Sequence, residues 1–242
     1  EIQPAGSVLY VSAGSNNGLF IKTNRSLYGM GNNQYGKLGV GDTTGRPTPV
    51  QIVSSGVAQV ATGSTHSAFV KFDGSLWSMG HNWQGQLGNG QSGTNVNPNP
   101  LNIISSGVNQ VSVGFYHTLI LKNDGSVWST GGNGQNQLGD GTNVARSTPA
   151  QVISSGVQGV SAGKYHSVVL KTNGSVWSFG KNDKGQLGDG TWANKSTPAQ
   201  SISSGVVQVS AGSITTYALR NDDSVRAMGA NTSGQLGIGN LT

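Results

Sequence analysis

The sequence predicts an all-β protein, a β-propeller built of four-stranded antiparallel blades. A segment resembling Gly-Gln-Leu-Gly recurs five times at a spacing of about 50 residues, beginning at Gly36, Gly85, Asn136, Gly185 and Gly234. Every copy contains short apolar runs that are separated by turn sequences, and none has the periodicity of a helix. Glycine accounts for 39 of the 242 residues, as expected for a chain with many tight turns.

The fourth repeat shows the four expected strands in order. Val157–Gly163 is apolar with small residues, which suits an innermost strand near a central channel. His166–Lys171 is almost entirely apolar, and a "TNG" turn joins it to Ser175–Gly180. A long glycine-rich stretch then leads to Thr197–Ser203, whose proline favours an edge strand at the outer rim.

We expect residues 1–242 to form a single propeller domain. The repeats are placed at roughly 7–55, 56–106, 107–155, 156–204, and 205–242 plus 1–6. The last repeat stops before its fourth strand, while the N-terminal "EIQ" corresponds to Val50–Ile52 of the next repeat. The N-terminal strand is therefore expected to join the last blade and close a five-bladed ring, which removes an exposed sheet edge. The alternative is a fragment of a longer propeller.

Several segments resemble the repeat of the regulator of chromosome condensation (RCC1) family. The segments "VSAGKYHSVVL" (Val160–Leu170) and "VATGSTHSAFV" (Val60–Val70) resemble its signature, and "SVWSFG" and "GQLGDG" resemble the rest of the repeat. The resemblance covers nearly the whole chain and implies a propeller, usually of seven blades. Five copies depart from that number, and Asn17 and Thr215 replace the signature histidine in the first and last repeats.

The resemblance leaves the function open, because one fold serves many functions. The eukaryotic founder acts as a nucleotide exchange factor for the GTPase Ran and binds chromatin. That activity depends on acidic residues and a protruding β-wedge, and no insertion here is long enough for such a wedge. The texture is closest to bacterial secreted members such as the β-lactamase inhibitory protein II, which bind proteins through aromatic residues in the Gly-x-x-His loops. This likeness, together with the absence of cysteine, predicts a secreted or cell-surface bacterial protein.

The strand order places two sets of loops on one face of the propeller. Strands alternate in direction, so the Gly-x-x-His loops and the Asn-x-x-Gly-Gln-Leu-Gly stretches emerge together. Aromatic residues at their variable positions are not shared by all five repeats and are candidate binding anchors, with packing against a neighbouring blade as the alternative. The candidate binding residues are Tyr35, Trp83, Phe115, Tyr116, Tyr165 and Trp192.

Residues that recur in several blades are interpreted as structural. A tryptophan recurs on the third strand and is expected to pack between blades rather than stack on a ligand. A histidine recurs at the start of the second strand and is expected to hydrogen-bond neighbouring backbone rather than bind a metal. The recurring residues are Trp77, Trp128 and Trp177, and His66, His117 and His166.

The composition narrows the function classes. Only 10% of the residues are charged, and the net charge of +5 is spread without a basic cluster, so nucleic-acid binding is not expected. No apolar run is long enough for membrane insertion. No spacing indicates a nucleophile–base pair, so we expect no enzyme activity, no catalytic residues, no cofactor and no metal.

The predicted function is that of a non-catalytic binding or scaffold propeller that recognises a protein partner through aromatic loops on one face. The alternatives are a carbohydrate-binding propeller or an architectural fragment of a larger propeller or surface protein. A monomer is expected in preference to an oligomer. The carbohydrate alternative rests on a shared asparagine that could offer its amide to sugars or stabilise its own loop, at Asn33, Asn82, Asn133, Asn182 and Asn231.

Overall fold

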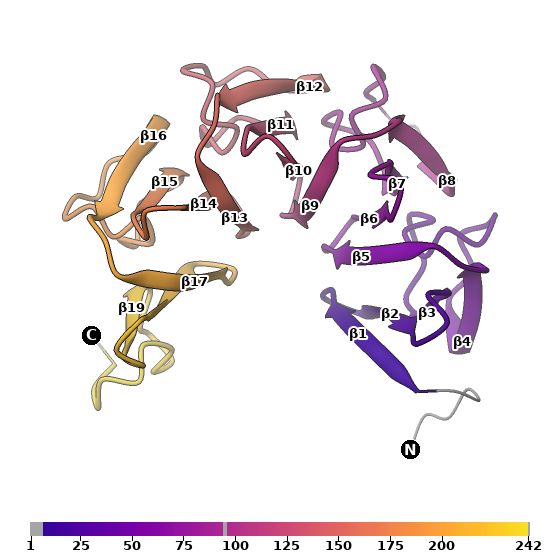
Figure 1. Ribbon diagram of the computed structural model, residues 1–242, viewed down its shortest axis with the longest axis horizontal. Helices are drawn as coiled ribbons and strands as arrows, with labels where there is room; N and C mark the ends of the chain where they lie inside the picture. Colours follow the sequence, from indigo (N-terminus) through magenta and orange to yellow (C-terminus); the bar gives the residue numbers. More distant parts are fainter. Residues whose placement is uncertain (1–6, 94–95, 242) are drawn as a thin grey trace.

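Five antiparallel sheets stand side by side along an arc in the computed structural model (Figure 1), which describes residues 7–93 and 96–241. Four sheets have four strands, and the fifth has three within the described residues. The described part of the chain contains no helix. The predicted all-β architecture of four-stranded antiparallel blades is confirmed.

The strands follow one another in the same order in every blade. The first blade comprises β1 (Val8–Ala13), β2 (Asn17–Lys22), β3 (Leu27–Gly31) and β4 (Arg46–Val53), and the second β5 (Val57–Thr62), β6 (His66–Lys71), β7 (Leu76–His81) and β8 (Val96–Ile104). The third comprises β9 (Val108–Val113), β10 (His117–Lys122), β11 (Val127–Gly131) and β12 (Arg146–Ile153). The fourth comprises β13 (Val157–Ala162), β14 (His166–Lys171), β15 (Val176–Gly180) and β16 (Lys195–Ile202), and the fifth β17 (Val206–Ala211), β18 (Thr215–Arg220) and β19 (Val225–Gly229).

Within each blade, every strand pairs with the next strand in sequence, and the first strand lies nearest the centre of the arc (Figure 1). In the fourth blade, Val169 of β14 lies opposite Val160 on one side and Trp177 on the other. The fourth strand pairs with the third through a shifted register, where Trp177 faces Gln200. The consecutive order brings both long loops of a blade to the same edge of its sheet.

The hydrophobic core lies between the blades rather than within any one of them. The first cluster joins Leu19 and Ile21 of the first blade to Val60 and Phe69 of the second, and three similar clusters fill the other seams. In the second, third and fourth blades both faces of the second strand are therefore covered, which explains why these strands are almost entirely apolar. A single blade cannot bury its faces alone, so the stacked blades stabilise one another.

The predicted ring closure is not shown by the structure. The segment expected to close the ring, residues 1–6, lies outside the described residues, and Figure 1 shows a gap between the first and fifth blades. Val11 on the innermost strand of the first blade is 70% exposed, whereas its counterpart Val60 is 1% exposed. The first blade therefore has one side that no other described blade covers.

Candidate functional site

Backbone hydrogen bonds join the two kinds of loop on one edge of each blade, as the strand order predicted. The Gly132 amide donates to the Tyr116 carbonyl oxygen at 2.7 Å, and the Lys181 amide donates to the Tyr165 carbonyl oxygen at 2.9 Å. The chain leaving the third strand is thereby fixed beside the Gly-x-x-His loop. We call this edge the loop face; the short hairpin turns lie on the opposite edge.

Glycines form the inner rim of the loop face because neighbouring blades approach closely there. A Cβ atom on Gly63 would lie 2.5 Å from the Gly114 carbonyl oxygen, and one on Gly114 would lie 2.6 Å from the Gly163 carbonyl oxygen. Only glycine fits such an approach. The Phe115 amide also donates to the Lys164 carbonyl oxygen of the next blade at 3.3 Å, so the loops are connected around the arc.

The recurring histidines connect the blades beneath this rim. The Nε2 atom of His117 lies 3.0 Å from Ser167 Oγ of the next blade, and that hydroxyl donates to the Gln137 carbonyl oxygen at 2.7 Å. Since the hydroxyl proton is used in this way, His117 must donate from Nε2. The sequence predicted a hydrogen bond from the histidine to neighbouring backbone, and the structure shows that this contact is indirect, through the Ser167 hydroxyl. Burial lowers the pKa of His117 to about 3, so the ring is neutral at neutral pH.

The two other recurring histidines repeat this arrangement. His66 Nε2 lies 2.8 Å from Thr118 Oγ1, and His166 Nε2 lies 3.0 Å from Thr216 Oγ1. Burial lowers the pKa of His66 to about 3 and that of His166 to about 4. Each histidine bonds within its own seam, and nowhere in residues 7–93 and 96–241 do three His, Asp or Glu side chains group to hold a metal ion.

The shared asparagines hold their own loops together. Asn182 is fully buried, and its Nδ2 donates to the Thr191 carbonyl oxygen at 2.9 Å while its Oδ1 accepts from the Leu187 amide at 3.0 Å. The other four make the same pair of bonds, with the carbonyl nine residues ahead and the leucine amide five residues ahead. The amides that the carbohydrate alternative required are used within the fold.

The recurring tryptophans are structural, as predicted. Trp77 is partly buried against the first core cluster, its ring stacks on Phe69 at 6.1 Å between centroids, and its Nε1 donates to Ser75 Oγ at 2.9 Å. The Lys71 amino group lies 4.6 Å from the centre of its ring. The same lysine–tryptophan–serine arrangement recurs in the third and fourth blades.

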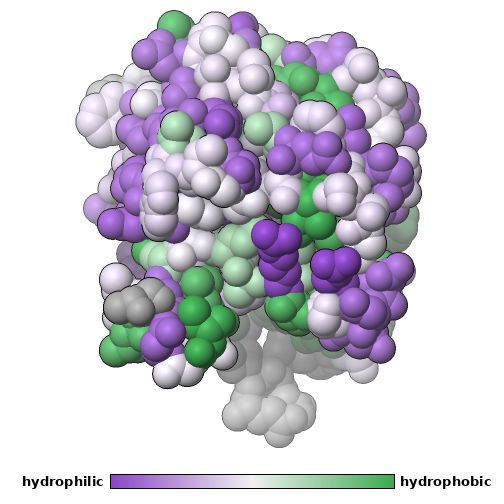
Figure 2. Space-filling model, turned by 90° about the vertical axis from the view of Figure 1, so that its left-hand side faces the viewer, coloured by the Kyte–Doolittle hydropathy of each residue, from purple (hydrophilic) through white to green (hydrophobic). Residues whose placement is uncertain are grey.

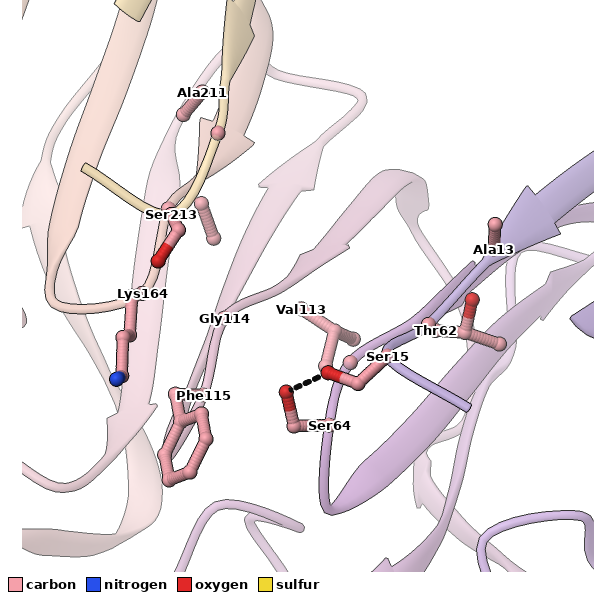
Figure 3. A pocket seen from close by; sticks show the side chains of 15 residues that line it. Ala13, Ser15, Thr62, Ser64, Val113, Gly114, Phe115, Lys164, Ala211 and Ser213 are labelled. Atoms are coloured by element: carbon pink, nitrogen blue, oxygen red, sulfur yellow. Dashed lines mark hydrogen bonds between the residues drawn. The ribbon is translucent and has the colours of Figure 1, made fainter. Parts of the chain in front are cut away.

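A cavity of about 430 Å³ opens at the centre of the loop face, where the Gly-x-x-His loops of all five blades meet (Figure 3). Small side chains such as Ser15 and Ser64, whose hydroxyls lie 2.5 Å apart, line one side of it. Phe115 and Lys164 stand on the other side and are the largest side chains labelled there. The cavity is therefore asymmetric despite the repeated framework.

Three of the predicted binding residues come together beside this cavity. The Phe115 ring lies 4.4 Å from Tyr116 and 5.8 Å from Tyr165, between centroids. The Lys164 amino group lies 5.2 Å from the Phe115 ring and 5.4 Å from the Tyr165 ring. All four side chains are partly exposed, so this cluster combines apolar area with a positive charge.

Two more predicted residues, Tyr35 and Trp83, meet through His81. The His81 ring lies 4.7 Å from Tyr35 and 6.0 Å from Trp83, between centroids. Trp83 itself is 58% exposed. Burial raises the pKa of Tyr116, and the neighbouring Tyr165 and Tyr35 raise it further. We call the five predicted residues with His81 and Lys164 the aromatic cluster.

Trp192 stands apart from the aromatic cluster. It is 71% exposed and borders a separate cavity of about 340 Å³ with Lys184, Arg226 and Met228 at the seam of the fourth and fifth blades. Sequence reasoning did not single out His81. Its only signal in the sequence is that it stands at the end of the third strand, at a position whose residue differs in every repeat.

These features define the class: a β-propeller whose blades are joined by glycine rims and histidine bridges. The RCC1-like domain family matches residues 1–242, and the chain belongs to this family. It is 33% identical over 138 residues to the ultraviolet-B receptor UVR8 of Arabidopsis thaliana, a match that covers 55% of this chain and 31% of the receptor.

Solved propellers have the same fold. Human WBSCR16 superposes with a TM-score of 0.84 at 26% identity, covering 97% of this chain and 64% of that one. Yeast RCC1 (Prp20), solved with Kap60 bound, superposes with a TM-score of 0.84 at 19% identity, covering 96% of this chain and 58% of that one. The Prp20p structure from Saccharomyces cerevisiae, described with its binding to Gsp1p and histones, gives a TM-score of 0.83 at 20% identity over 96% of this chain and 60% of that one. The chain thus spans less than two thirds of the length of these relatives.

The structure has no helix with the length and apolar character to cross a membrane, as far as the described residues go.

Proposed function

We propose that this chain is a non-catalytic binding propeller that holds one protein partner on its loop face. The observation that carries the proposal is the aromatic cluster, in which rings that are not shared by all five blades gather around Phe115 and Lys164. Rigid aromatic side chains with a nearby cation are typical anchors of protein interfaces. Their loops are fixed by the glycine rim and the asparagine bonds, so little order would be lost on binding.

The uneven distribution of the anchors favours a single asymmetric partner. The cluster occupies the first four blades, whereas the loop of the fifth blade offers Ser213 and Ile214 instead. A ligand repeated around the arc would require equal sites in equal blades. Yeast RCC1 binds proteins such as Kap60, which supports a protein partner at the level of the class.

The alternatives have less support. The carbohydrate hypothesis depended on the shared asparagines, and their amide groups already bond to their own loops. The architectural hypothesis, the monomeric state and the secreted or cell-surface location stay predictions from the sequence.

The test compares loop-face variants with a matched variant on the other edge. Trp83→Ala and Phe115→Ala alter the aromatic cluster. Phe72→Ala is the matched control, because its ring is 62% exposed, close to the 58% of Trp83, and lies in a hairpin turn on the opposite edge. Partners captured from the source cells on the wild-type chain are identified by mass spectrometry and then titrated by calorimetry. We expect each loop-face variant to weaken the one-to-one complex at least tenfold and Phe72→Ala to leave it unchanged.

If Phe72→Ala weakens the complex and the loop-face variants do not, the interface lies on the opposite edge and the proposal is overturned. Circular dichroism of each variant establishes that the loss is not one of folding. Since Trp83 is mostly exposed, its removal leaves the core untouched.

A further inference from the structure

The seam between the fourth and fifth blades differs from the other seams in three positions that share one cavity. Elsewhere, a lysine at the end of the second strand lies over a tryptophan of the third, and the tryptophan packs beside an isoleucine or valine of the preceding blade. At this seam those three positions hold Arg220, Arg226 and Ser201. A cavity of about 390 Å³ lies where the tryptophan ring would be, lined by these residues with Gln200, Ser203 and Ser204.

The three replacements all change the seam in the same chemical direction. An aromatic ring becomes a guanidinium, an aliphatic side chain becomes a hydroxyl, and the remaining cation becomes a second guanidinium. The fourth core cluster accordingly includes Ile202 and Met228 but neither Arg226 nor Ser201. A polar cavity thus takes the place of the tryptophan at this seam, beside the remaining apolar cluster. Figure 2 shows the side of the molecule on which the fourth and fifth blades lie, where hydrophilic residues cover much of the surface.

The two guanidinium groups have few partners in the described chain. The Nε atom of Arg220 is buried, and among residues 7–93 and 96–241 no group accepts a hydrogen bond from it. Its nearest carboxylate oxygen, Asp222 Oδ2, lies 4.0 Å away on a side chain that is 61% exposed and already accepts bonds from Ser224. The Arg226 side chain is exposed, and its guanidinium forms no hydrogen bond or ion pair with the described residues. Two like charges in one cavity repel each other unless an anion lies between them.

We propose that this cavity binds a tetrahedral oxyanion, either inorganic phosphate or sulfate or the same group as a monoester. Arginine presents a planar fork of donors that matches the oxygens of such groups, and two forks neutralise a doubly charged anion. Hydroxyls at Ser203 and Ser204 add donors at the rim. The cavity volume exceeds that of a bare ion, which leaves room for an attached group.

This site is separate from the aromatic cluster, although Arg226 also borders the cavity beside Trp192. Its residues lie at the end of β16, in the turn that follows, and on β18 and β19. The Asn221 amide donates to the Gly205 carbonyl oxygen at 2.9 Å, which places this turn on the edge opposite the loop face. A Trp83→Ala variant is therefore expected to retain the anion site.

The experiment titrates the whole chain with sodium phosphate, sodium sulfate and phenyl phosphate at constant ionic strength set with sodium chloride. Calorimetry gives the affinity, and thermal unfolding in the same solutions gives an independent reading. The key variant, Arg226→Trp with Ser201→Val, restores the residues of the intact seams and should fold well. We expect at least a tenfold loss of affinity for all three anions and loss of the thermal shift, while Lys171→Arg in the fourth blade changes neither.

The outcomes separate the possibilities. Binding of inorganic ions and of phenyl phosphate with similar affinity supports a site for the oxyanion itself, and tighter binding of the ester supports a monoester on a larger molecule. Equal responses of the wild type and the restored variant would show general adsorption and overturn the proposal, as would no binding by the wild type. If the restored variant fails to fold, Arg220→Gln is titrated in its place. It should lose affinity for the three anions in the same way, and an unchanged affinity would overturn the proposal.

Discussion

Acidification should destabilise this propeller through its three bridging histidines, well before any carboxylate is protonated. His66, His117 and His166 are buried and neutral, with pKa values lowered by burial to about 3, 3 and 4 from an ordinary value of 6.5. The unfolded chain therefore binds more protons than the folded chain between these values. Stability is fully present above pH 6.5 and falls as the pH falls toward 4.

The size of the effect follows from these values. Each histidine contributes about 1.4 kcal/mol per pH unit across this window, hence about 2 kcal/mol between pH 6.5 and pH 5. Three independent histidines would contribute about 6 kcal/mol, a large part of the stability of an ordinary domain. The aspartates whose pKa values are lowered, such as Asp73 and Asp124, lose their contribution only below their ordinary value of 3.8, so they do not act in this range.

Urea unfolding at a series of pH values between 7.5 and 5 measures this slope, and His117→Asn tests its origin. Asparagine already occupies the equivalent position in the first blade, at Asn17. The variant should lose about 1–3 kcal/mol at pH 7.5, because Ser167 Oγ loses its buried donor. It should also reduce the slope by about one third. His81 is half-buried on the loop face and stays in both proteins, so its contribution cancels.

An unchanged slope in His117→Asn would refute the reasoning, because the proton uptake would then come from other groups. A wild type whose stability is constant from pH 7 to pH 5 would refute it for all three histidines at once. Circular dichroism and tryptophan fluorescence should give coincident unfolding curves, which is needed before either slope is interpreted.

Two further predictions concern the framework. Gly114→Ala should destabilise the chain by at least about 2 kcal/mol in urea unfolding, because the new methyl group would clash with the His117 imidazole and the Gly163 carbonyl oxygen. Gly134→Ala is the control: no atom lies within 4 Å of its added carbon, so its stability should be unchanged. Asn182→Ala should lower the free energy of unfolding by about 2–3 kcal/mol and speed proteolysis of its loop, because the Leu187 amide and the Thr191 carbonyl lose their bonds to the buried Asn182 side chain. An unchanged rate of cleavage would contradict this role.

The repeated elements could be read from the sequence because the same physics acts in every copy. The expected strand Val157–Gly163 is observed as Val157–Ala162, and His166–Lys171 is observed with the same bounds. The roles of the recurring tryptophans and asparagines followed in the same way, since a residue that every blade needs is part of the blade. The histidines bond through a hydroxyl, a contact that crosses blades and has no sequence signal.

The closure of the ring and the grouping of the aromatic binding residues could not be predicted from the repeats. The angle between blades depends on packing such as that of Phe69 against the preceding blade, and nothing in the repeat length specifies it. The six candidate anchors were chosen by type and by loop, yet the structure places Trp192 at another seam and brings His81 between Tyr35 and Trp83. His81 and Trp83 are close in sequence, but Tyr35 belongs to the preceding repeat, so only the fold could reveal this group.

A repeat protein with equal blades records its specific functions as departures from the repeat, but a departure alone does not mark a site. Single replacements, such as Thr215 for the bridging histidine, are absorbed by the fold, since this residue stays buried. What distinguishes the aromatic cluster and the arginine cavity is that several departures meet in space although they are far apart in sequence. Chance replacements would scatter over the seams and loops, whereas Ser201, Arg220 and Arg226 share one cavity and change it in one chemical direction. Convergence of that kind is the strongest ground that this fold offers for assigning a site.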